Sequence, residues 1–228
     1  MKEDWLTIDT VPESVLKYPE RVVSLLSPFL TTSRKEKIEK VLDQRIGGLK
    51  VVFDRPYDPH NCAAALRSCE AFGVQYIDVI RHPERDFYIS KKVTQGSHKW
   101  LFIKIYRDQR EWLKTISQFN GMIIGCDPRG ETISNIEIKE PLIIIIGNEH
   151  DGLSPEIKAI CHRLVSIPMF GFVESFNLSV STALVLSKVV ERLKRGDLSE
   201  EERLKIKAIW YYRSCGHSDQ ILKKHGLI

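Results

Sequence analysis

Six short aliphatic runs, each separated from the next by a polar or amphipathic segment, constrain the fold of this chain more than any other feature. In chain order the runs are LKVVF, VQYIDVI, LFIKIY, GMIIGC, LIIIIG and RLVSIP. This alternation is typical of β–α–β units, in which helices cover a sheet of parallel strands. The sequence therefore predicts an α/β fold with a mostly parallel sheet flanked by helices.

The segments before and after these runs have helical patterns. Ser33 with Glu36 has the spacing of a capping box and predicts a helix that ends before Gly47. Ser199 with Glu202 has the same spacing, ahead of a helix rich in Trp and Tyr. We therefore divide the chain into an N-terminal helical extension, a central domain and a C-terminal helical extension: 1–46, 47–192 and 193–228.

Composition narrows the class of protein. A chain of 228 residues can bury a sizeable core, and no aliphatic run approaches the roughly 20 residues that span a bilayer. The first residues lack the apolar stretch of a signal peptide. Five cysteines without a C-x-x-C pair indicate reduced thiols rather than a disulfide framework or a zinc site. We expect a cytoplasmic protein with no membrane segment and no metal.

Basic residues are clustered along the chain. Between Arg81 and Arg110 there are eight basic residues and three acidic ones. Such clustering permits a polyanionic partner such as RNA. Charge alone still favours the simpler explanation that these side chains are solvated surface.

Three of the predicted strands end in polar, glycine-rich segments. CDPRGET begins at Cys126, GNEHDG follows Ile146, and PMFGFVESFNLS follows Ile167. Open α/β sheets bind ligands beyond the carboxyl ends of their strands, so these segments are the candidate site. The sequence has no G-x-G-x-x-G, P-loop, H-E-x-x-H or G-x-S-x-G motif. An enzyme with this sequence would therefore use a less common kind of site.

Three blocks in order carry a resemblance to a known family. They are PHNCAAALRSCEAFGV, IIIIGNEHDGLSPE and IPMFGFVESFNLSVSTALVL, and VTQGSHKWL is similar to a further family segment. From about Gly48 to Val190 the chain resembles the SpoU-type (TrmH-type) RNA 2′-O-ribose methyltransferases of the SPOUT superfamily. With its flanking helices it looks most like the tRNA (guanosine 2′-O) methyltransferase branch, which acts in the D-loop.

The resemblance implies S-adenosylmethionine as methyl donor, a homodimer, and a trefoil knot in the C-terminal half of the domain. GNEHDG and FGFVESFNLS would be the knot loops that hold the cofactor, and no metal is required. The implied substrate is tRNA. Ribosomal RNA is the alternative, although members acting on it typically carry a larger N-terminal domain. A non-catalytic RNA-binding protein with the same fold is a third hypothesis, against which the retained site residues argue.

The resemblance also implies site residues. The positions matching the family's catalytic residues are Asn61, Arg67, Glu149, Ser175 and Asn177. The positions matching its cofactor contacts are Cys126, Gly147, Ile167, Met169, Phe176 and Leu178. Family proposals make Arg67 the general base for the target hydroxyl. Because a guanidinium keeps its proton up to a pKa of about 12, stabilising the developing alkoxide or clamping an RNA phosphate is easier physically.

Each of these residues also has a purely structural explanation. Asn61 is a plausible N-cap of the helix carrying Arg67, and Glu149 a cap of the helix after Gly152. Arg67 is a surface arginine with Glu70 or Glu36 as candidate partners. Ser175 and Asn177 suit the start of the last long helix of the domain, and Ile167 and Met169 suit an ordinary core.

Departures from the family pattern lie beside the motifs. Phe176 stands where leucine is usual, and Gln95 replaces a small or basic residue. Asp151 adds a negative charge where RNA phosphates are expected. The extensions supply candidates for gripping RNA: Arg34, Lys35, Lys37, Trp210, Tyr211, Tyr212 and Arg213. For Trp210 and Tyr211, packing inside the protein is at least as good an explanation.

Overall fold

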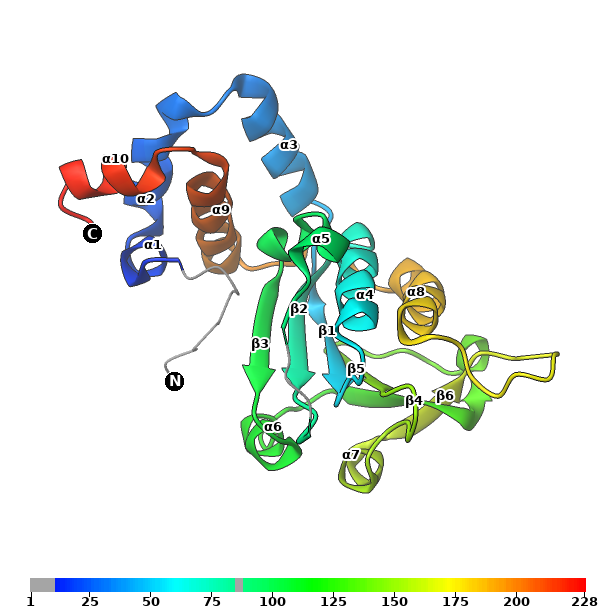
Figure 1. Ribbon diagram of the computed structural model, residues 1–228. Helices are drawn as coiled ribbons and strands as arrows, with labels where there is room; N and C mark the ends of the chain where they lie inside the picture. The colour runs from blue at the N-terminus through cyan, green and yellow to red at the C-terminus, as the bar shows by residue number, and fades with distance from the viewer. Residues whose placement is uncertain (1–10, 85–87) are drawn as a thin grey trace. The chain divides into compact units, whose positions relative to one another are not determined.

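The chain divides into two compact units, each with its own packing. The computed structural model describes residues 11–84 and 88–228, apart from the side chain of Lys91. Of the described residues, one unit comprises Gly48–Lys194 and the other combines residues 11–47 with Arg195–Ile228 (Figure 1). The first ten residues of the predicted N-terminal extension lie outside the described residues, as do Arg85 and Asp86 of the basic segment.

A six-stranded sheet forms the larger unit. Its strands are β1 (Ile46–Asp54), β2 (Val74–Ile80), β3 (Phe102–Tyr106), β4 (Met122–Thr132), β5 (Leu142–Gly147) and β6 (Arg163–Ser166). Their spatial order is β3-β2-β1-β5-β4-β6, and the ladders β1·β5, β2·β3, β4·β5 and β4·β6 are all parallel. Each aliphatic run of the sequence forms one strand, so the predicted parallel sheet is confirmed.

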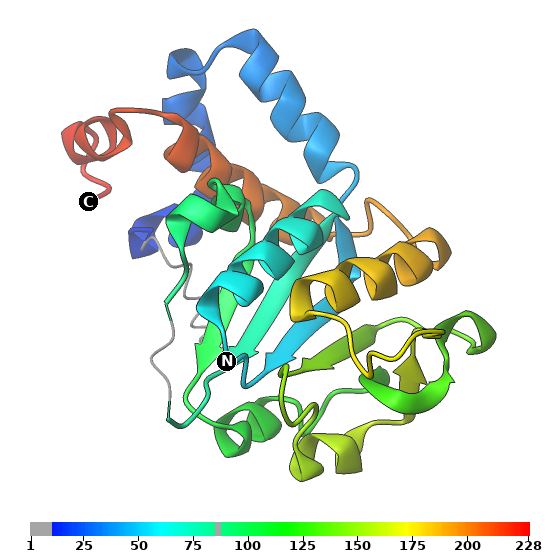
Figure 2. The same ribbon diagram turned by 45° about the vertical axis from the view of Figure 1, so that its right-hand side comes forward.

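Helices cover both faces of this sheet. Helix α4 (Pro59–Ala71) connects β1 to β2, so this crossover runs toward the β3 edge of the sheet. Helix α6 (Gln109–Thr115) connects β3 to β4 and α7 (Pro155–Ile160) connects β5 to β6, so these crossovers run toward the β6 edge. Right-handed crossovers in opposite directions place their helices on opposite faces. Helix α4 packs against α8 (Leu178–Val189), and the two lie side by side in Figure 2. Trp112 of α6 and Ile157 of α7 are buried in the core of the other face.

Shorter elements complete the larger unit. They are α5 (Lys91–Thr94) and the 3₁₀ turns η2 (Ser97–Trp100), η3 (Ile133–Asn135) and η4 (Val190–Arg192). Within the described ranges, no helix of either unit is both long and apolar enough to cross a membrane.

Strand β4 is longer than the sequence predicted. CDPRGET was expected to be a polar segment beyond the strand, but β4 continues through it to Thr132. Cys126 and Glu131 both pair with Val165 of β6, so the intervening residues form a bulge. A bulge leaves extra residues out of the ladder and bends the strand, which brings Asp127 and Arg129 to the sheet's carboxyl edge.

The second unit consists of helices from both ends of the chain. They are α1 (Glu13–Lys17), α2 (Pro19–Leu26), η1 (Ser27–Phe29), α3 (Thr32–Leu42), α9 (Glu200–Ser214) and α10 (Ser218–Lys224). The predicted Ser199–Glu202 capping box is confirmed, with both reciprocal hydrogen bonds present. The predicted Ser33 cap is wrong, because Thr31 caps α3 by accepting the N–H of Arg34 at 3.2 Å.

Burial separates the RNA candidates of this unit into two groups. Trp210 and Tyr211 are only 2% and 3% exposed, and the Arg45 guanidinium lies 5.0 Å from the Trp210 ring. These two aromatic residues are therefore core, and their assignment to RNA binding is wrong. Arg34 and Lys37 are exposed on α3 and remain candidates.

Candidate functional site

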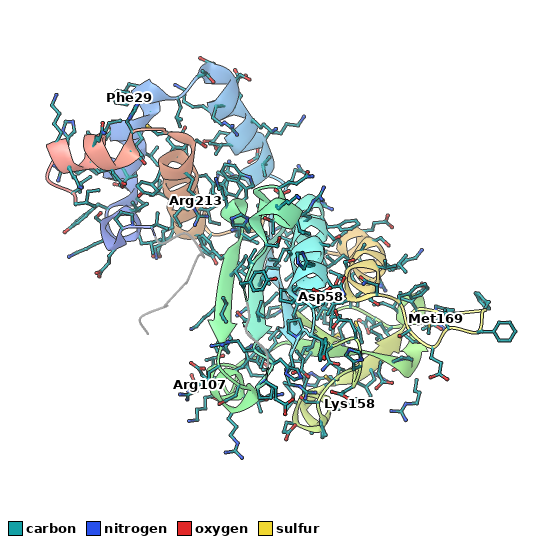
Figure 3. All side chains as sticks on the ribbon, in the orientation of Figure 1. Phe29, Asp58, Arg107, Lys158, Met169 and Arg213 are labelled. Atoms are coloured by element: carbon teal, nitrogen blue, oxygen red, sulfur yellow. The ribbon has the colours of Figure 1, made fainter. Side chains whose placement is uncertain are left out.

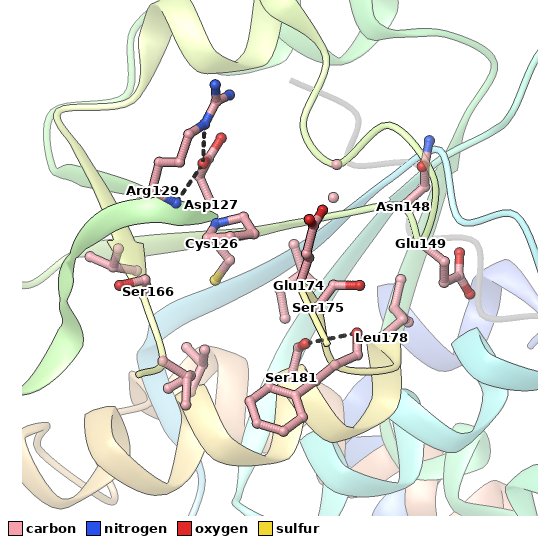
Figure 4. A pocket seen from close by; sticks show the side chains of 18 of the residues that line it. Cys126, Asp127, Arg129, Asn148, Glu149, Ser166, Glu174, Ser175, Leu178 and Ser181 are labelled. Carbon is pink, nitrogen blue, oxygen red and sulfur yellow. Dashed lines mark hydrogen bonds and ion pairs between the residues drawn. The ribbon is translucent and has the colours of Figure 1, made fainter. Parts of the chain in front are cut away.

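A cavity of about 670 Å³ opens at the carboxyl ends of β4, β5 and β6. The three polar segments singled out in the sequence contribute most of its lining. All six residues matched to the cofactor contacts line it: Cys126, Gly147, Ile167, Met169, Phe176 and Leu178. Figure 4 shows Cys126 and Asp127 on one side, Glu149 on the other, and Glu174 and Ser175 between them. The strand ends therefore form one concave site.

The loop after β5 is held tightly by its own hydrogen bonds. The Oδ1 of Asn148 accepts the N–H groups of His150 and Asp151 at 2.9 and 2.7 Å. The N–H of Asn148 donates to the carbonyl of Gly152 at 3.2 Å. A Cβ on Gly147 would overlap the backbone of Gly152, so this position has room only for glycine. The loop folds back on the end of β5 and forms a fixed wall of the cavity.

A buried carboxylate anchors the far end of this loop. Asp54 at the end of β1 is fully buried, and its Oδ2 accepts the N–H of Ser154 at 2.7 Å. Ser154 precedes α7, so the carboxylate satisfies a backbone donor at a helix start. Sequence reasoning missed Asp54, because its partner lies 100 residues away.

Asn61 is not the N-cap that the sequence predicted. The cap of α4 is Asp58, which accepts the N–H of His60 at 2.8 Å, with Pro59 at the first helical position. Asp58 is labelled in Figure 3. Aspartate followed by proline is a stronger signal for a helix start than asparagine alone, so Asp58 could have been predicted as the N-cap from the sequence. Asn61 lies inside the first turn and its side chain can bond elsewhere.

Three matched residues from separate elements form a hydrogen-bond network. The Nδ2 of Asn61 donates to Oε1 of Glu149 at 2.9 Å, and its Oδ1 accepts Nδ2 of Asn177 at 2.8 Å. The other oxygen of Glu149 accepts the backbone N–H of Tyr57 at 3.1 Å. The carboxylate thus bonds to α4 and to the loop after β1, not to the start of the following helix. The network joins both cavity loops to α4.

Asn177 and Ser175 have different surroundings. Asn177 caps α8, accepting the N–H of Ser179 at 2.8 Å, which confirms the helix start predicted there. Ser175 lies before the helix and lines the cavity. Asn177 therefore caps α8, as its structural explanation predicted, and is also part of the network. Ser175 does not cap the helix and lines the cavity instead.

Arg67 lies apart from this group. It follows Asn61 by six residues on α4, which is a rise of about 9 Å along a helix. Its Nη1 donates to the carbonyl of Val93 at 3.3 Å, and it is not among the residues that line the cavity. The structure therefore brings together Asn61, Glu149, Ser175 and Asn177 but leaves Arg67 at a separate position on the same helix.

Cys126 is a wall of the cavity rather than a nucleophile. Burial, followed by the neighbouring Cys161 thiol, raises the pKa of Cys126 to about 12. Burial, followed by the charge of Asp54, raises the pKa of Cys161 to about 12 as well. Both thiols are therefore protonated near neutral pH, and a protonated thiol is a poor nucleophile.

An ion pair closes one side of the cavity. Asp127 is 6% exposed; its Oδ2 lies 2.6 Å from Nζ of Lys158, and its Oδ1 accepts the N–H of Arg129 at 2.9 Å. Burial alone would raise the pKa of Asp127, but these hydrogen bonds outweigh it and hold the pKa below its usual value. The carboxylate is therefore charged at neutral pH and fixes the bulge of β4.

Replacing Asp127 with asparagine is expected to lower the free energy of unfolding by about 1–3 kcal/mol near neutral pH, because Lys158 loses its buried partner. The folded pKa is depressed, so this stabilisation is complete above the unfolded pKa of about 4 and is lost as pH falls through the folded pKa. Urea unfolding of both proteins from about pH 7 to pH 3 checks this. A difference that stays constant below about pH 4 would contradict the assignment.

The comparison with protein families decides what kind of protein carries this site. Residues 48–187 match the model described as the SpoU rRNA Methylase family, which is more than half of the chain. The chain belongs to this family. The resemblance seen in the three sequence blocks is therefore confirmed, and so is the prediction of a methyltransferase fold.

Curated members of the SpoU family are similar over most of the chain. A tRNA (guanosine(18)-2′-O)-methyltransferase of Aquifex aeolicus is 32% identical over 187 residues, covering 78% of this chain and 89% of the relative. One of Borreliella burgdorferi is 28% identical over 209 residues, covering 88% and 94%. A 23S rRNA (guanosine-2′-O-)-methyltransferase of Neisseria meningitidis is 32% identical but covers only 61% and 57%.

Solved structures of SpoU proteins show the same fold. The A. aeolicus TrmH/SpoU tRNA modifying enzyme aligns with a TM-score of 0.71 at 31% identity, covering 80% of this chain and 96% of that one. The SpoU methyltransferase AviRb of Streptomyces viridochromogenes, solved in complex with AdoMet, aligns with a TM-score of 0.59 at 27% identity, covering 67% and 63%.

Proposed function

We propose that this SpoU-family protein transfers a methyl group from S-adenosylmethionine to the ribose 2′-hydroxyl of a tRNA nucleotide, a D-loop guanosine. The observation that carries the proposal is the cavity, whose lining includes every residue matched to the family's cofactor contacts. Coverage favours the tRNA branch, since the A. aeolicus and B. burgdorferi relatives match along 78% and 88% of the chain and the N. meningitidis relative along 61%. That extent includes residues outside the family domain.

The cavity fits the proposed donor. Its volume of about 670 Å³ falls within the range of small-molecule sites. Gly147 also lines the cavity, and its missing side chain lets the backbone of Gly152 pack directly against the end of β5. When bound, S-adenosylmethionine supplies an activated methyl group on a sulfonium. The chain contributes position, because transfer requires the 2′-oxygen in line with that methyl carbon.

The network beside the cavity is suited to orienting a ribose. Glu149 lines the cavity and is held by Asn61, which in turn is held by Asn177. A carboxylate fixed from two sides is a preorganised acceptor for a sugar hydroxyl, and Ser175 adds a hydroxyl nearby. We assign Arg67 the role of stabilising negative charge on the RNA, either on the developing alkoxide or on an adjacent phosphate.

The proposal includes a homodimer, a trefoil knot and a cytoplasmic location. Support for the dimer comes from the loop after β6, where Phe170, Phe172 and Val173 are 97%, 109% and 65% exposed. This loop carries Met169 and projects away from the sheet in Figure 3. Apolar side chains gathered in this way mark an interaction surface. Sedimentation should give the mass of two chains; a single-chain mass would contradict the dimer.

Exposed basic residues of the terminal helices are proposed to grip RNA outside the cavity. Arg34 and Lys37 lie on one side of α3, three residues apart. Basic side chains bind RNA phosphates and release the counterions held there. The affinity of the protein for RNA should therefore fall as the salt concentration rises.

The experiment that tests the proposal incubates the purified protein with labelled S-adenosylmethionine and unmodified tRNA or ribosomal RNA, and then maps the methylated nucleotide. Label on the 2′-oxygen of a D-loop guanosine is the expected result. Label only in ribosomal RNA would favour the second candidate, which the N. meningitidis relative supports over part of the chain. Cofactor binding without label in either RNA would contradict the catalytic proposal and favour a non-catalytic RNA-binding protein.

A further inference from the structure

Three aromatic rings meet beside the cavity, each from the loop after a different strand. Tyr57 follows β1, His82 follows β2 and His150 follows β5, and these three strands are neighbours in the sheet. The Tyr57 ring lies 5.7 Å from that of His82 and 4.3 Å from that of His150, centroid to centroid. Both contacts are edge-on, with interplanar angles of 86° and 75°. Tyr57 is the centre of the cluster.

Hydrogen bonds hold the described residues around each of the three rings. The N–H of Tyr57 donates to Glu149, and the N–H of His150 donates to Asn148. Nδ1 of His82 accepts the N–H of Glu84 at 3.2 Å. The rings are therefore set in place by the same loops that form the cavity and its network. A rigid group of this kind is preorganised for a ligand.

The cluster is open to solvent at the edge of the cavity. His150 is exposed and also lines the cavity, whereas Tyr57 and His82 are half-buried. Three aromatic rings at the edge of a cavity offer flat surface, which suits a planar ligand. The face of a nucleobase meets that requirement, and stacking on aromatic side chains is how proteins commonly hold unpaired RNA bases.

We propose that Tyr57, His82 and His150 receive the base of the nucleotide that is methylated. The inference rests on the proposed function, which places the target ribose beside Glu149 at the cavity edge. The base is bonded to that ribose, so it must lie within one nucleotide of the cavity. Glu149 holds the backbone of Tyr57 and is followed directly by His150, which puts the rings at that distance.

Steady-state methylation of tRNA by Tyr57→Leu and His150→Ala variants tests the inference. Loss of one stacking contact is expected to lower kcat/KM for RNA by about 5- to 150-fold in either variant. The Kd for S-adenosylmethionine should stay close to wild type in Tyr57→Leu, because Tyr57 is not among the residues that line the cavity. Tyr57→Phe keeps the ring and should retain more efficiency than Tyr57→Leu. Tyr18→Leu removes an exposed tyrosine of the terminal helices and is the matched control.

A spectroscopic readout separates stacking from simple packing. RNA with 2-aminopurine at the mapped target position should lose fluorescence on binding the wild type and less on binding Tyr57→Leu. If the wild type methylates tRNA but Tyr57→Leu matches it in kcat/KM and in quenching, this inference is overturned and the proposed function stands. If the wild type methylates no RNA, the proposed function fails and the inference fails with it.

Discussion

Replacing Gly147 with alanine is expected to abolish binding of S-adenosylmethionine and to destabilise the fold by about 3 kcal/mol or more. The added Cβ would overlap backbone atoms of Gly152 and Leu153, which no change of rotamer can relieve. Relief requires the loop to move away from β5, and this loop forms a wall of the cavity. Calorimetric titration with the cofactor and urea unfolding measure the two effects.

Gly216→Ala is the matched control for this variant. Gly216 lies between α9 and α10, away from the cavity residues, and a Cβ added to it would meet no other atom within 4 Å. Alanine there should bind the cofactor with wild-type affinity and unfold at the same urea concentration. Wild-type cofactor affinity in Gly147→Ala would mean that the loop after β5 does not hold the ligand.

Arg67→Ala is expected to lower kcat by about two to three orders of magnitude while leaving the Kd for S-adenosylmethionine unchanged. The first effect follows from removing a fixed positive charge from the developing alkoxide. The second follows from the structure, because Arg67 does not line the cavity and bonds to the carbonyl of Val93. Single-turnover methylation at saturating RNA measures the chemical step directly.

The same variant distinguishes the two roles left open for this arginine. If Arg67 clamps an RNA phosphate, KM rises, kcat changes little, and the slope of log affinity against log salt falls by about one. Arg163→Ala, which removes another exposed arginine that pairs with Glu131, is the control for a general loss of charge. Wild-type kcat and KM in Arg67→Ala would remove this residue from the mechanism.

The sheet was predictable from sequence because buried parallel strands are continuous aliphatic runs. Each of the six runs became a strand, and the runs fix which residues are inside. The end of β4 was not predictable in the same way. Its polar segment contains Pro128 and Gly130, which usually interrupt strands, and the strand resumes its pairing with β6 only at Glu131.

The residues of the candidate site were predictable from the sequence, but the hydrogen bonds between them were not. Resemblance pointed to Asn61, Glu149 and Asn177, yet the hydrogen bonds that join them link positions 88 and 116 residues apart. The cluster around Tyr57 left no local signal for the same reason. Each of the three residues lies in a separate loop of the sequence, and only the order of the strands in the folded sheet brings the rings together.

The helical unit has a consequence for how the chain is made. Arg203 of α9 contacts Glu39 at 2.7 Å and Asp43 at 2.8 Å, so residues about 160 positions apart hold one unit together. A contact of such sequence separation forms late, because the intervening chain must close a large loop first. On the ribosome the N-terminal helices must wait for α9 to be synthesised. Deleting the helices at either end of the chain would therefore disrupt the same unit, because the helices from the other end would lose the surface against which they pack.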